Sequence, residues 1–551
     1  MFFPRNFPNK FERPLIELLL LLEEDFKKVV PSDDKKFNRL VLDKLKMNDI
    51  QKYFKDIKPS NWWLTFILLR HEEKFSPKFI EHIRPFLTKT KTRSTSGIVA
   101  LSLFTKGVGC PFSCVYCPNE PGVPKSYFSD EPAVMRAIRH NFDPYKQTLQ
   151  RLIMFALSNH PIDKVEIIIK GGTFSFYPKA YRRWFVKRIF DACNVDVTSY
   201  LRTGGLMCNS SKTLIHAQKK NEIGKSRIIG INIETRPDYI TKGEIKFLRT
   251  LGVTHVEIGV QILDDEIYKL INRGHKVKDV IDATLLLKNA GFKVGYHLMP
   301  NLPGSNPEKD KETLIKTFND DDFKPDHLKL YPTTITKYTQ LSGWYKQGRY
   351  KPYSIEKLTE MIVEFKSKIA PPWVRIGRLI RDITTTVMEG DGIAPNLREV
   401  IQSRMKEGGL HCNCIRCREI KDQKVIGQAR LRITKYNASK GQEYFLEFID
   451  DVNNILGFLR LRVPEFDSKN NLPSIVRELH VYGQALSLGR HDDTKIQHMS
   501  FGKQLLSEAE KITKGLRINK ITVIAGIGAR EYYKKLGYHL EETYMVKNLL
   551  S

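Results

Sequence analysis

Hydrophobic positions follow two patterns along the chain, and each pattern predicts a separate α/β region. Between residues 96 and 370, short continuous apolar runs alternate with amphipathic segments. The expected strands lie at 97–104, 165–169, 228–233, 256–260, 294–299 and 327–331, and the expected helices at 132–157, 179–192, 242–251, 277–290 and 309–318. Continuous apolar strands separated by helices are typical of a buried parallel sheet. This region is therefore predicted to form a partial (β/α)6 barrel.

Three further segments flank the predicted barrel. Residues 1–95 are helical by pattern and end in a basic stretch that either contacts nucleic acid or is a solvated connector. Residues 371–424 form a connector rich in arginine and cysteine. Residues 425–551 show a second α/β pattern, with strands expected at 444–449, 456–463, 475–482 and 520–525 and helices from 501 and through 533.

Composition narrows the possible partners. The 551 residues are 41% hydrophobic, which excludes global disorder. The formal net charge of +28 favours a polyanionic partner, nucleic acid ahead of an anionic membrane, over a merely solubilising surface. The apolar stretch at 15–22 is interrupted by Glu17 and is too short to span a bilayer, and no secretory signal is evident. We therefore expect no membrane association and a reducing, cytoplasmic location.

Six of the eight cysteines form two tight triplets, which indicates metal ligands. Cys110, Cys114 and Cys117 follow the first predicted strand with the spacing C-x3-C-x2-C. Three thiolates on such a loop hold three irons of a 4Fe-4S cluster and leave the fourth iron open to S-adenosylmethionine (SAM). Zinc is the alternative, but it normally needs a fourth protein ligand. A loop of this kind after the first strand of a βα array is typical of radical-SAM enzymes.

Polar residues follow the later predicted strands, at the edge where parallel α/β folds bind ligands. Glycines there allow close approach of the backbone, and Glu and Arg pair with hydroxyl, ammonium or carboxylate groups. Each residue alone is also explained by a turn or an ion pair, but together they predict a SAM pocket. The pocket residues are Gly171, Gly172, Thr173, Glu234, Arg236 and Gln261, with Lys329 as a candidate catalytic residue and Tyr331 facing the same cavity.

The last region contains a loop similar to the coenzyme A loop of GNAT acetyltransferases. Backbone N–H groups at the following helix N-terminus would bind the pyrophosphate. Ser500 stands where the first glycine of the loop is expected. The predicted acetyl-CoA contacts are Gln497, His498, Gly502, Lys503, Tyr532 and Tyr533, although the two tyrosines would alternatively only pack. Glu478 is a candidate base, or it forms a satisfied polar pair with His480 on the same strand face.

The second triplet, Cys412, Cys414 and Cys417, reads C-x-C-x2-C and predicts a structural zinc site rather than a second iron–sulfur cluster. Its fourth ligand is either His411 or a remote His or Cys. The unpaired thiols of Cys193 and Cys208 are expected to be buried. A phosphate-binding ladder, or a set of internal ion pairs, is predicted for Arg375, Arg378, Arg381 and Arg398.

These motifs together resemble the catalytic subunit of Elongator, the tRNA uridine acetyltransferase family. The matching stretches span roughly residues 90–551 and are CPFSCVYCPNEP, EPAVMRAIRHNFDPY, KGGTF, NIETRPD, VEIGVQ, LKLYP, RIGRLIRDI, HCNCIRCRE, RELHVYG and YYKKLGY. The resemblance implies a partial radical-SAM barrel followed by a GNAT-type α/β acetyltransferase domain, after a helical N-terminal segment.

The resemblance also implies a reaction. A radical derived from SAM would abstract hydrogen from the methyl group of acetyl-CoA. The carbon radical would add to the wobble uridine of tRNA, and thioester hydrolysis would leave 5-carboxymethyluridine. Implied partners are tRNA and either accessory subunits like those of Elongator or a second copy of the chain. Two alternatives stay open: a protein lysine acetyltransferase with a structural iron–sulfur domain, and a tRNA-binding scaffold without turnover.

Overall fold

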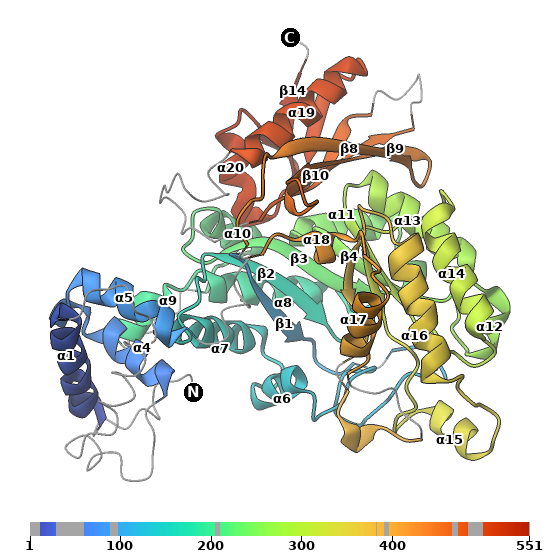
Figure 1. The fold of residues 1–551 in the computed structure, drawn as a ribbon, viewed down its shortest axis with the longest axis horizontal. Helices are drawn as coiled ribbons and strands as arrows, with labels where there is room; N and C mark the ends of the chain where they lie inside the picture. The colour runs from blue at the N-terminus through green and yellow to red at the C-terminus, as the bar shows by residue number, and fades with distance from the viewer. Residues whose placement is uncertain are drawn as a thin grey trace.

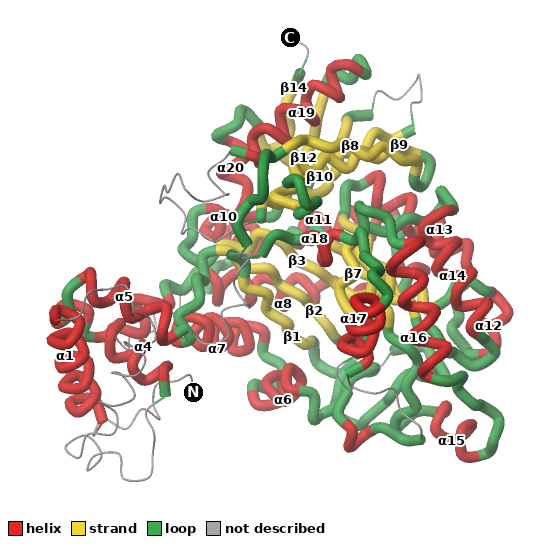
Figure 2. The backbone as a smooth tube through the Cα atoms, in the orientation of Figure 1, coloured by secondary structure: helices red, strands yellow, loops and turns green. Residues whose placement is uncertain are grey.

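The computed structural model contains two seven-stranded sheets, one above the other, with a group of N-terminal helices at one end (Figure 1). It describes residues 11–28, 60–88, 97–108, 110–203, 210–381, 383–390, 396–421, 423–465, 472–482 and 500–549. Figure 2 shows the strands of the first sheet inside a layer of helices. None of the helices in the described ranges combines the length and apolar character that a bilayer crossing requires.

The first sheet is parallel throughout, with β1 and β7 as its two open edges. Its strands are β1 (Val99–Phe104), β2 (Lys164–Lys170), β3 (Arg227–Thr235), β4 (His255–Gln261), β5 (Lys293–Leu298), β6 (His327–Leu330) and β7 (Arg375–Arg378). The predicted α/β fold with a partial parallel barrel is confirmed. The predicted number of six strands is wrong, because β7 comes from the presumed connector. Only Ile376 of this short strand is buried, so its sequence carries little strand signal.

The helices around this sheet are α6 (Pro132–Arg139), α7 (Pro144–Leu157), α8 (Lys179–Cys193), α9 (Val197–Thr203), α10 (Leu214–Glu222), α11 (Lys242–Leu251), α12 (Asp265–Leu270), α13 (Val277–Asn289), α14 (Pro307–Asn319), α15 (Gln340–Lys346), α16 (Ile355–Glu364), α17 (Leu397–Glu407) and α18 (Ile415–Arg418). Four of the five predicted helical segments agree with helices of this set, α8, α11, α13 and α14, whereas α9, α10, α12 and α15 to α18 were not predicted. The single helix expected at 132–157 is wrong. Asn141 and Phe142 adopt positive φ angles of 50° and 57°, and the Asp143 side chain caps a new helix.

The second sheet has the order β13-β14-β12-β11-β10-β9-β8. Its strands are β8 (Arg430–Asn437), β9 (Gly441–Ile449), β10 (Ile455–Pro464), β11 (Ser474–Val481), β12 (Lys520–Val523), β13 (His539–Glu541) and β14 (Tyr544–Asn548), and its helices are α19 (Phe501–Gly515) and α20 (Arg530–Lys534). Among these strands, only β11 and β12 pair in parallel. The second α/β region is thus confirmed. The edge strands β8 and β13 escaped prediction because their side chains are mostly exposed.

The N-terminal helices form a separate layer beside the first sheet. They are α1 (Glu12–Lys28), α4 (Asn61–Arg70) and α5 (Pro77–Leu87). The amide of Asn159, just after α7, donates to the carbonyl of Arg84 in α5 at 2.7 Å. The described part of residues 1–95 is therefore helical, as predicted, and it is attached to the barrel. Most of the basic stretch that ends this segment lies outside the described residues.

The second sheet docks on the amino-terminal edge of the first sheet through buried charges. Arg477 of β11 donates to both carboxylate oxygens of Asp326, immediately before β6, at 2.6 and 2.7 Å. Arg477 also donates to Glu443 of β9 at 2.9 Å. Burial acts to raise the pKa of Asp326, but Arg477 outweighs it and holds that pKa well below its ordinary value. Opposite charges therefore meet across the domain boundary and set the orientation of the two sheets.

Candidate functional site

The first cysteine triplet lies in the loop after β1, at the carboxyl-terminal edge of the first sheet. Cys114 is buried, and Cys110 and Cys117 are half-buried. The sulfur of Cys110 lies 3.8 Å from Thr173 Oγ1, and Arg273 Nη1 donates to Cys114 Sγ at 3.6 Å. Burial, followed by the neighbouring thiols, raises the pKa of Cys117 to about 12. The protein alone therefore favours the neutral thiol of Cys117, whereas a bound cation would stabilise its thiolate.

Arg236, which was predicted to contact SAM, packs against the cysteine loop. Its guanidinium carbon lies 3.5 Å from the ring centre of Phe112, a residue between Cys110 and Cys114. It also donates to Asp238 Oδ1 at 2.9 Å and to the carbonyl of Arg273 at 2.7 Å. These contacts give Arg236 a role in positioning the loop.

Gly171 and Gly172 form the turn after β2 that the sequence placed at the ligand edge. Their φ angles are 140° and 87°, which favour glycine. A Cβ atom on Gly171 would overlap the Oγ1 atom of Thr105, which donates nearby to the carbonyl of Lys170 at 3.3 Å. The turn therefore needs glycine for its conformation and its close packing, and it brings Thr173 close to Cys110.

Four titratable side chains meet inside the barrel. Glu257 Oε2 lies 2.6 Å from His297 Nε2 and forms an ion pair with Lys329. Lys329 also lies 3.7 Å from Glu234 Oε1. Burial acts to raise the pKa of Glu257, but Lys329 and His297 outweigh it and hold that pKa well below its usual value. Burial acts to lower the pKa of Lys329, but Glu257 raises it, so the ammonium and both carboxylates stay charged.

Sequence reasoning placed Glu234 and Lys329 here but missed Glu257 and His297. Both missed residues lie in apolar runs that were interpreted as core strands. An acidic or imidazole side chain inside such a run is the available signal, since its burial requires a partner. Tyr127 was also missed, and its hydroxyl donates to Glu234 Oε2 at 2.5 Å.

Gln261 ends β4 with a positive φ of 72°, which is unusual for a residue other than glycine. Its Oε1 atom is buried and has no hydrogen-bond partner among the described residues. A buried acceptor without a partner is costly, so this amide is a candidate ligand contact, as the sequence predicted.

Of the predicted acetyl-CoA residues, Gly502, Lys503 and Tyr532 lie at or beside the start of α19. A Cβ atom on Gly502 would lie 2.9 Å from the Tyr532 hydroxyl, so Tyr532 reaches this helix end. Tyr532 is 38% exposed, whereas Tyr533 is 6% exposed and packs against Tyr538. Lys503 is exposed beside them, and Gln497 and His498 lie outside the described residues.

Glu478 sits in the domain interface. Its carboxylate accepts from Arg460 Nε at 2.8 Å and pairs with Lys293 of β5 at 3.4 Å. Burial acts to raise the pKa of Glu478, but Lys293 and Arg460 lower it. Burial also lowers the pKa of the neighbouring His480 to about 4. Glu478 thus pairs with Arg460 and Lys293, from the two sheets, and its role as a base stays a prediction.

The second triplet converges as the zinc prediction requires. The sulfurs of Cys412, Cys414 and Cys417 all lie within 4.8 Å of one another. In the described part of the chain, this group includes no fourth His, Cys, Asp or Glu, so His411 does not complete it. Lys366, 6% exposed, donates from Nζ to Cys417 Sγ at 3.7 Å. Lys366 belongs to a π-helical turn, η6 (Phe365–Ile369), and its role was missed.

The remaining predicted residues are the two single cysteines and the arginines of the proposed phosphate ladder. Cys193 is buried, as expected, while Cys208 lies outside the described residues. Arg375 forms an ion pair with Glu419 and donates to the Tyr482 hydroxyl at 3.0 Å. Arg381 pairs with Glu131 at 2.8 Å. These two arginines are thus engaged in the internal ion pairs that were the alternative to a phosphate ladder.

Comparisons with known proteins agree with this geometry. The Radical SAM superfamily model matches residues 104–315, and the Radical_SAM C-terminal domain model matches residues 325–407. The tRNA uridine(34) acetyltransferase of Dehalococcoides mccartyi is 41% identical over 478 residues, which are 84% of this chain and 100% of that protein. Human Elongator complex protein 3 is 38% identical over 496 residues, which are 86% of this chain and 88% of that protein.

A solved structure leads to the same family. The archaeal homologue from Methanocaldococcus infernus, with an N-terminal deletion, matches with a TM-score of 0.70 and 40% identity. The match covers 82% of this chain and 100% of that chain. The resemblance inferred from the motifs is therefore confirmed, and this chain belongs to the radical-SAM family of tRNA uridine(34) acetyltransferases and Elongator complex protein 3.

Proposed function

We propose that this chain forms 5-carboxymethyluridine at the wobble uridine of tRNA from acetyl-CoA by radical-SAM chemistry. The observation that carries the proposal is the presence of two ligand-binding arrangements in one chain, joined by a buried interface. One is the cysteine loop at the edge of the barrel, and the other is the start of α19 beside Tyr532. Relatives that carry the name tRNA uridine(34) acetyltransferase support uridine 34 as the modified base and an acetyl-derived group as the group that is transferred.

The residues of the first loop fit a 4Fe-4S cluster. Cys110, Cys114 and Cys117 would hold three irons, and Arg273 would donate to the bound sulfur of Cys114, as it does to the free thiol. Arg236 and Phe112 would keep the loop in place. When bound, the cluster together with SAM supplies one-electron reduction and hydrogen abstraction.

The barrel edge also fits SAM. The turn at Gly171 and Gly172 would present backbone groups to an amine or carboxylate, and Gln261 Oε1 would offer an acceptor that lacks a partner among the described residues. Glu234 would accept from ribose hydroxyls. Lys329, held protonated by Glu257, would place a positive charge beside the uracil or the carboxylate that forms.

In the second domain, the N–H groups at the start of α19 would bind the pyrophosphate of acetyl-CoA. Gln497, His498 and Lys503 would flank the pyrophosphate, and Tyr532 would lie beside the thioester. Tyr533 packs in the core and would support Tyr532 from behind. Glu478, fixed between Lys293 and Arg460, would hold the strand beside this site.

The second triplet fits zinc. Its three sulfurs are close enough to share one ion, and thiolates are preferred zinc ligands. Cys412, Cys414 and Cys417 would hold it, with the ammonium of Lys366 offsetting the surplus negative charge of three thiolates. Such a site would stabilise the connector between the domains.

An anaerobic assay tests the proposal. Reconstituted protein receives SAM, acetyl-CoA, a reductant and unmodified tRNA, and mass spectrometry follows 5′-deoxyadenosine and the digested nucleosides. We expect both 5′-deoxyadenosine and 5-carboxymethyluridine, and only when acetyl-CoA is present. Cys114→Ser should abolish the modification and spare tRNA binding. Modification that persists in Cys114→Ser would refute the radical mechanism, and acetylated protein without modified RNA would favour a protein acetyltransferase.

A further inference from the structure

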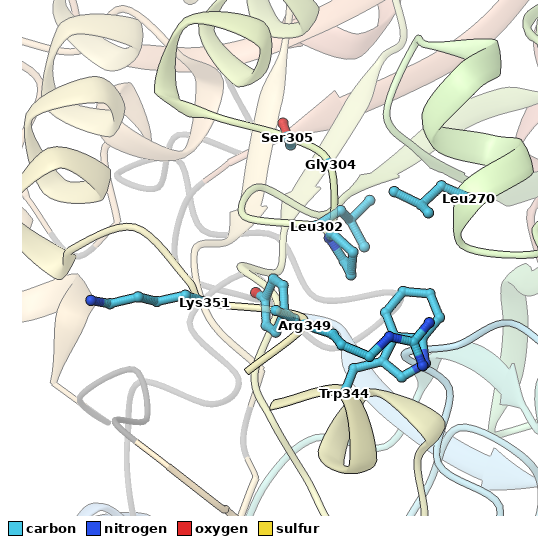
Figure 3. Close-up of a pocket in the computed structure, with 9 residues that line it drawn as sticks. Leu270, Leu302, Gly304, Ser305, Trp344, Arg349 and Lys351 are labelled. Atoms are coloured by element: carbon cyan, nitrogen blue, oxygen red, sulfur yellow. The ribbon is translucent and has the colours of Figure 1, made fainter. Parts of the chain in front are cut away.

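A pocket of about 310 Å³ opens at the loop side of the first sheet, apart from the residues assigned above to cluster, SAM or acetyl-CoA (Figure 3). One wall comes from Leu302 and the residues after it in the loop that follows β5. The opposite wall comes from Trp344 of α15 and the segment from Arg349 to Lys351. Figure 3 shows the Arg349 side chain lying against Trp344, with Lys351 extending in another direction.

The chemistry of these walls fits a nucleotide. The Arg349 guanidinium carbon lies 4.7 Å from the ring centre of Trp344. Arg349 and Lys351 are both exposed, and the residues that line the pocket include no aspartate or glutamate. An indole face stacks on any nucleobase, and exposed guanidinium and ammonium groups pair with phosphate. The pocket therefore favours an anionic ligand that also carries a flat ring.

The elements that line the pocket also contact the cysteine loop. The backbone N–H of Val115, next to Cys114, donates to the carbonyl of Ile271 at 3.0 Å, and Val115 accepts from the N–H of Leu341 at 3.0 Å. The side chain of Tyr116 packs against two apolar clusters, one containing Leu302 and the other bordered by Trp344. A ligand in the pocket would thus lie on the same layer of side chains that supports the loop.

We propose that this pocket binds an unpaired nucleotide of the RNA substrate near the modified uridine, with its base on Trp344 and its phosphate on Arg349 and Lys351. The proposal rests on the proposed function, which brings single-stranded RNA to this edge of the barrel. Proteins recognise RNA loops by stacking splayed bases on aromatic and guanidinium groups, and this pocket offers both.

Binding of fluorescently labelled, unmodified tRNA, measured by anisotropy at several salt concentrations, tests this proposal. Trp344→Ala should weaken binding by about 5- to 100-fold and leave the salt dependence unchanged, because stacking releases no counterions. Trp344→Phe should keep most of the affinity. Arg349→Ala and Lys351→Ala should each reduce the slope of log affinity against log salt by about 0.7 for a lost single-strand phosphate contact.

The matched controls are Trp184→Ala and Arg183→Ala on α8, where Trp184 is 44% exposed. Unchanged tRNA affinity in Trp344→Ala and Arg349→Ala, relative to these controls, would overturn the pocket proposal and leave the proposed function standing. Weaker binding of SAM or acetyl-CoA by Trp344→Ala, with tRNA binding intact, would assign the pocket to a cofactor and also overturn it. If the wild-type protein binds no tRNA, the proposed function fails, and the pocket proposal fails with it. Arg349 and Lys351 are exposed, so their variants keep the test valid if Trp344→Ala misfolds.

Discussion

Two clusters of buried titratable groups, one between the two sheets and one inside the barrel, use similar residues for different purposes. At the domain interface, Arg477, Asp326 and Glu443 keep no more than 1% of their side chains exposed. Inside the barrel, Lys329 and His297 each keep 17% exposed while pairing with Glu257. The interface cluster is closed, so it serves docking. The barrel cluster is open enough for a ligand to meet its ammonium and imidazole groups.

The largest effect is expected from Arg477→Met at the closed cluster. The change removes the cation that donates hydrogen bonds to both buried carboxylates, and Lys288 keeps only longer contacts with them, at 3.9 and 3.6 Å. It should therefore lower the free energy of unfolding by about 3–5 kcal/mol. Urea denaturation measures this loss. Arg432→Met is the control, since Arg432 is 39% exposed and its partner Glu447 keeps Arg418. Equal losses in the two variants would remove the distinction between a closed interface and an ordinary ion pair.

Lys329→Met tests the open cluster. The ionised form of Glu257 stabilises the fold above the ordinary pKa of a glutamate, and this contribution is lost as the pH falls through the depressed pKa of the folded state. Loss of Lys329 raises that pKa, so the unfolding free energy should depend less on pH in the acid range.

At neutral pH we expect Lys329→Met to lower the free energy of unfolding by about 1–3 kcal/mol, which is less than for a fully closed pair. Urea titrations at several pH values measure both effects, and Lys329→Arg is the charge-conserving control. If the unfolding free energy of Lys329→Met depends on acidic pH as in the wild-type protein, Lys329 does not hold down the pKa of Glu257.

Lys366→Met extends the comparison to the second cysteine triplet. With the hydrogen-bonding cation removed, zinc affinity should fall by about 10- to 100-fold, as for other groups that support metal ligands. Competition with a chelator on zinc-loaded protein measures the affinity. Lys368→Met is the matched control, because Lys368 lies on the same π-helical turn but its side chain is 71% exposed. Equal affinities in the two variants would contradict a role for Lys366.

The smallest effect is expected at an uncharged position, Ser500. Its φ of 58° is favourable for glycine and strained for serine. Ser500→Gly should therefore raise the free energy of unfolding by about 0.4–1 kcal/mol, whereas Ser500→Ala should not. Thermal unfolding of the three proteins measures the difference. Equal unfolding free energies for Ser500→Gly and Ser500→Ala would show that backbone strain at Ser500 does not reduce the stability of the fold.

Local sequence patterns predicted the elements whose signal lies in neighbouring residues. Six strands of the first sheet were found because their apolar runs are continuous. The second triplet was recognised from its spacing, and its three sulfurs do converge. Such features depend on a few adjacent side chains and on short loops, so little tertiary information is needed to infer them.

Other features depend on residues far apart in the chain. The strand at Ile376 was missed because only pairing with β6 makes it part of the sheet. Glu257 was interpreted as part of a core strand, and its partners His297 and Lys329 come from two other strands. Arg236 was assigned to SAM from its position at a strand end, and its contact with Phe112 of the cysteine loop could not be inferred from sequence.

The sequence by itself determined the two α/β regions, the two cysteine triplets and the family, because each is encoded in contiguous motifs. Only the tertiary structure decided which charges pair, which arginines face the interior and where a pocket opens beside Trp344. The physical reason is that a buried charge needs a partner but not a neighbour in sequence. The partner is chosen by the sheet register and by domain docking, which bring together residues such as Asp326 and Arg477 from opposite sides of the interface.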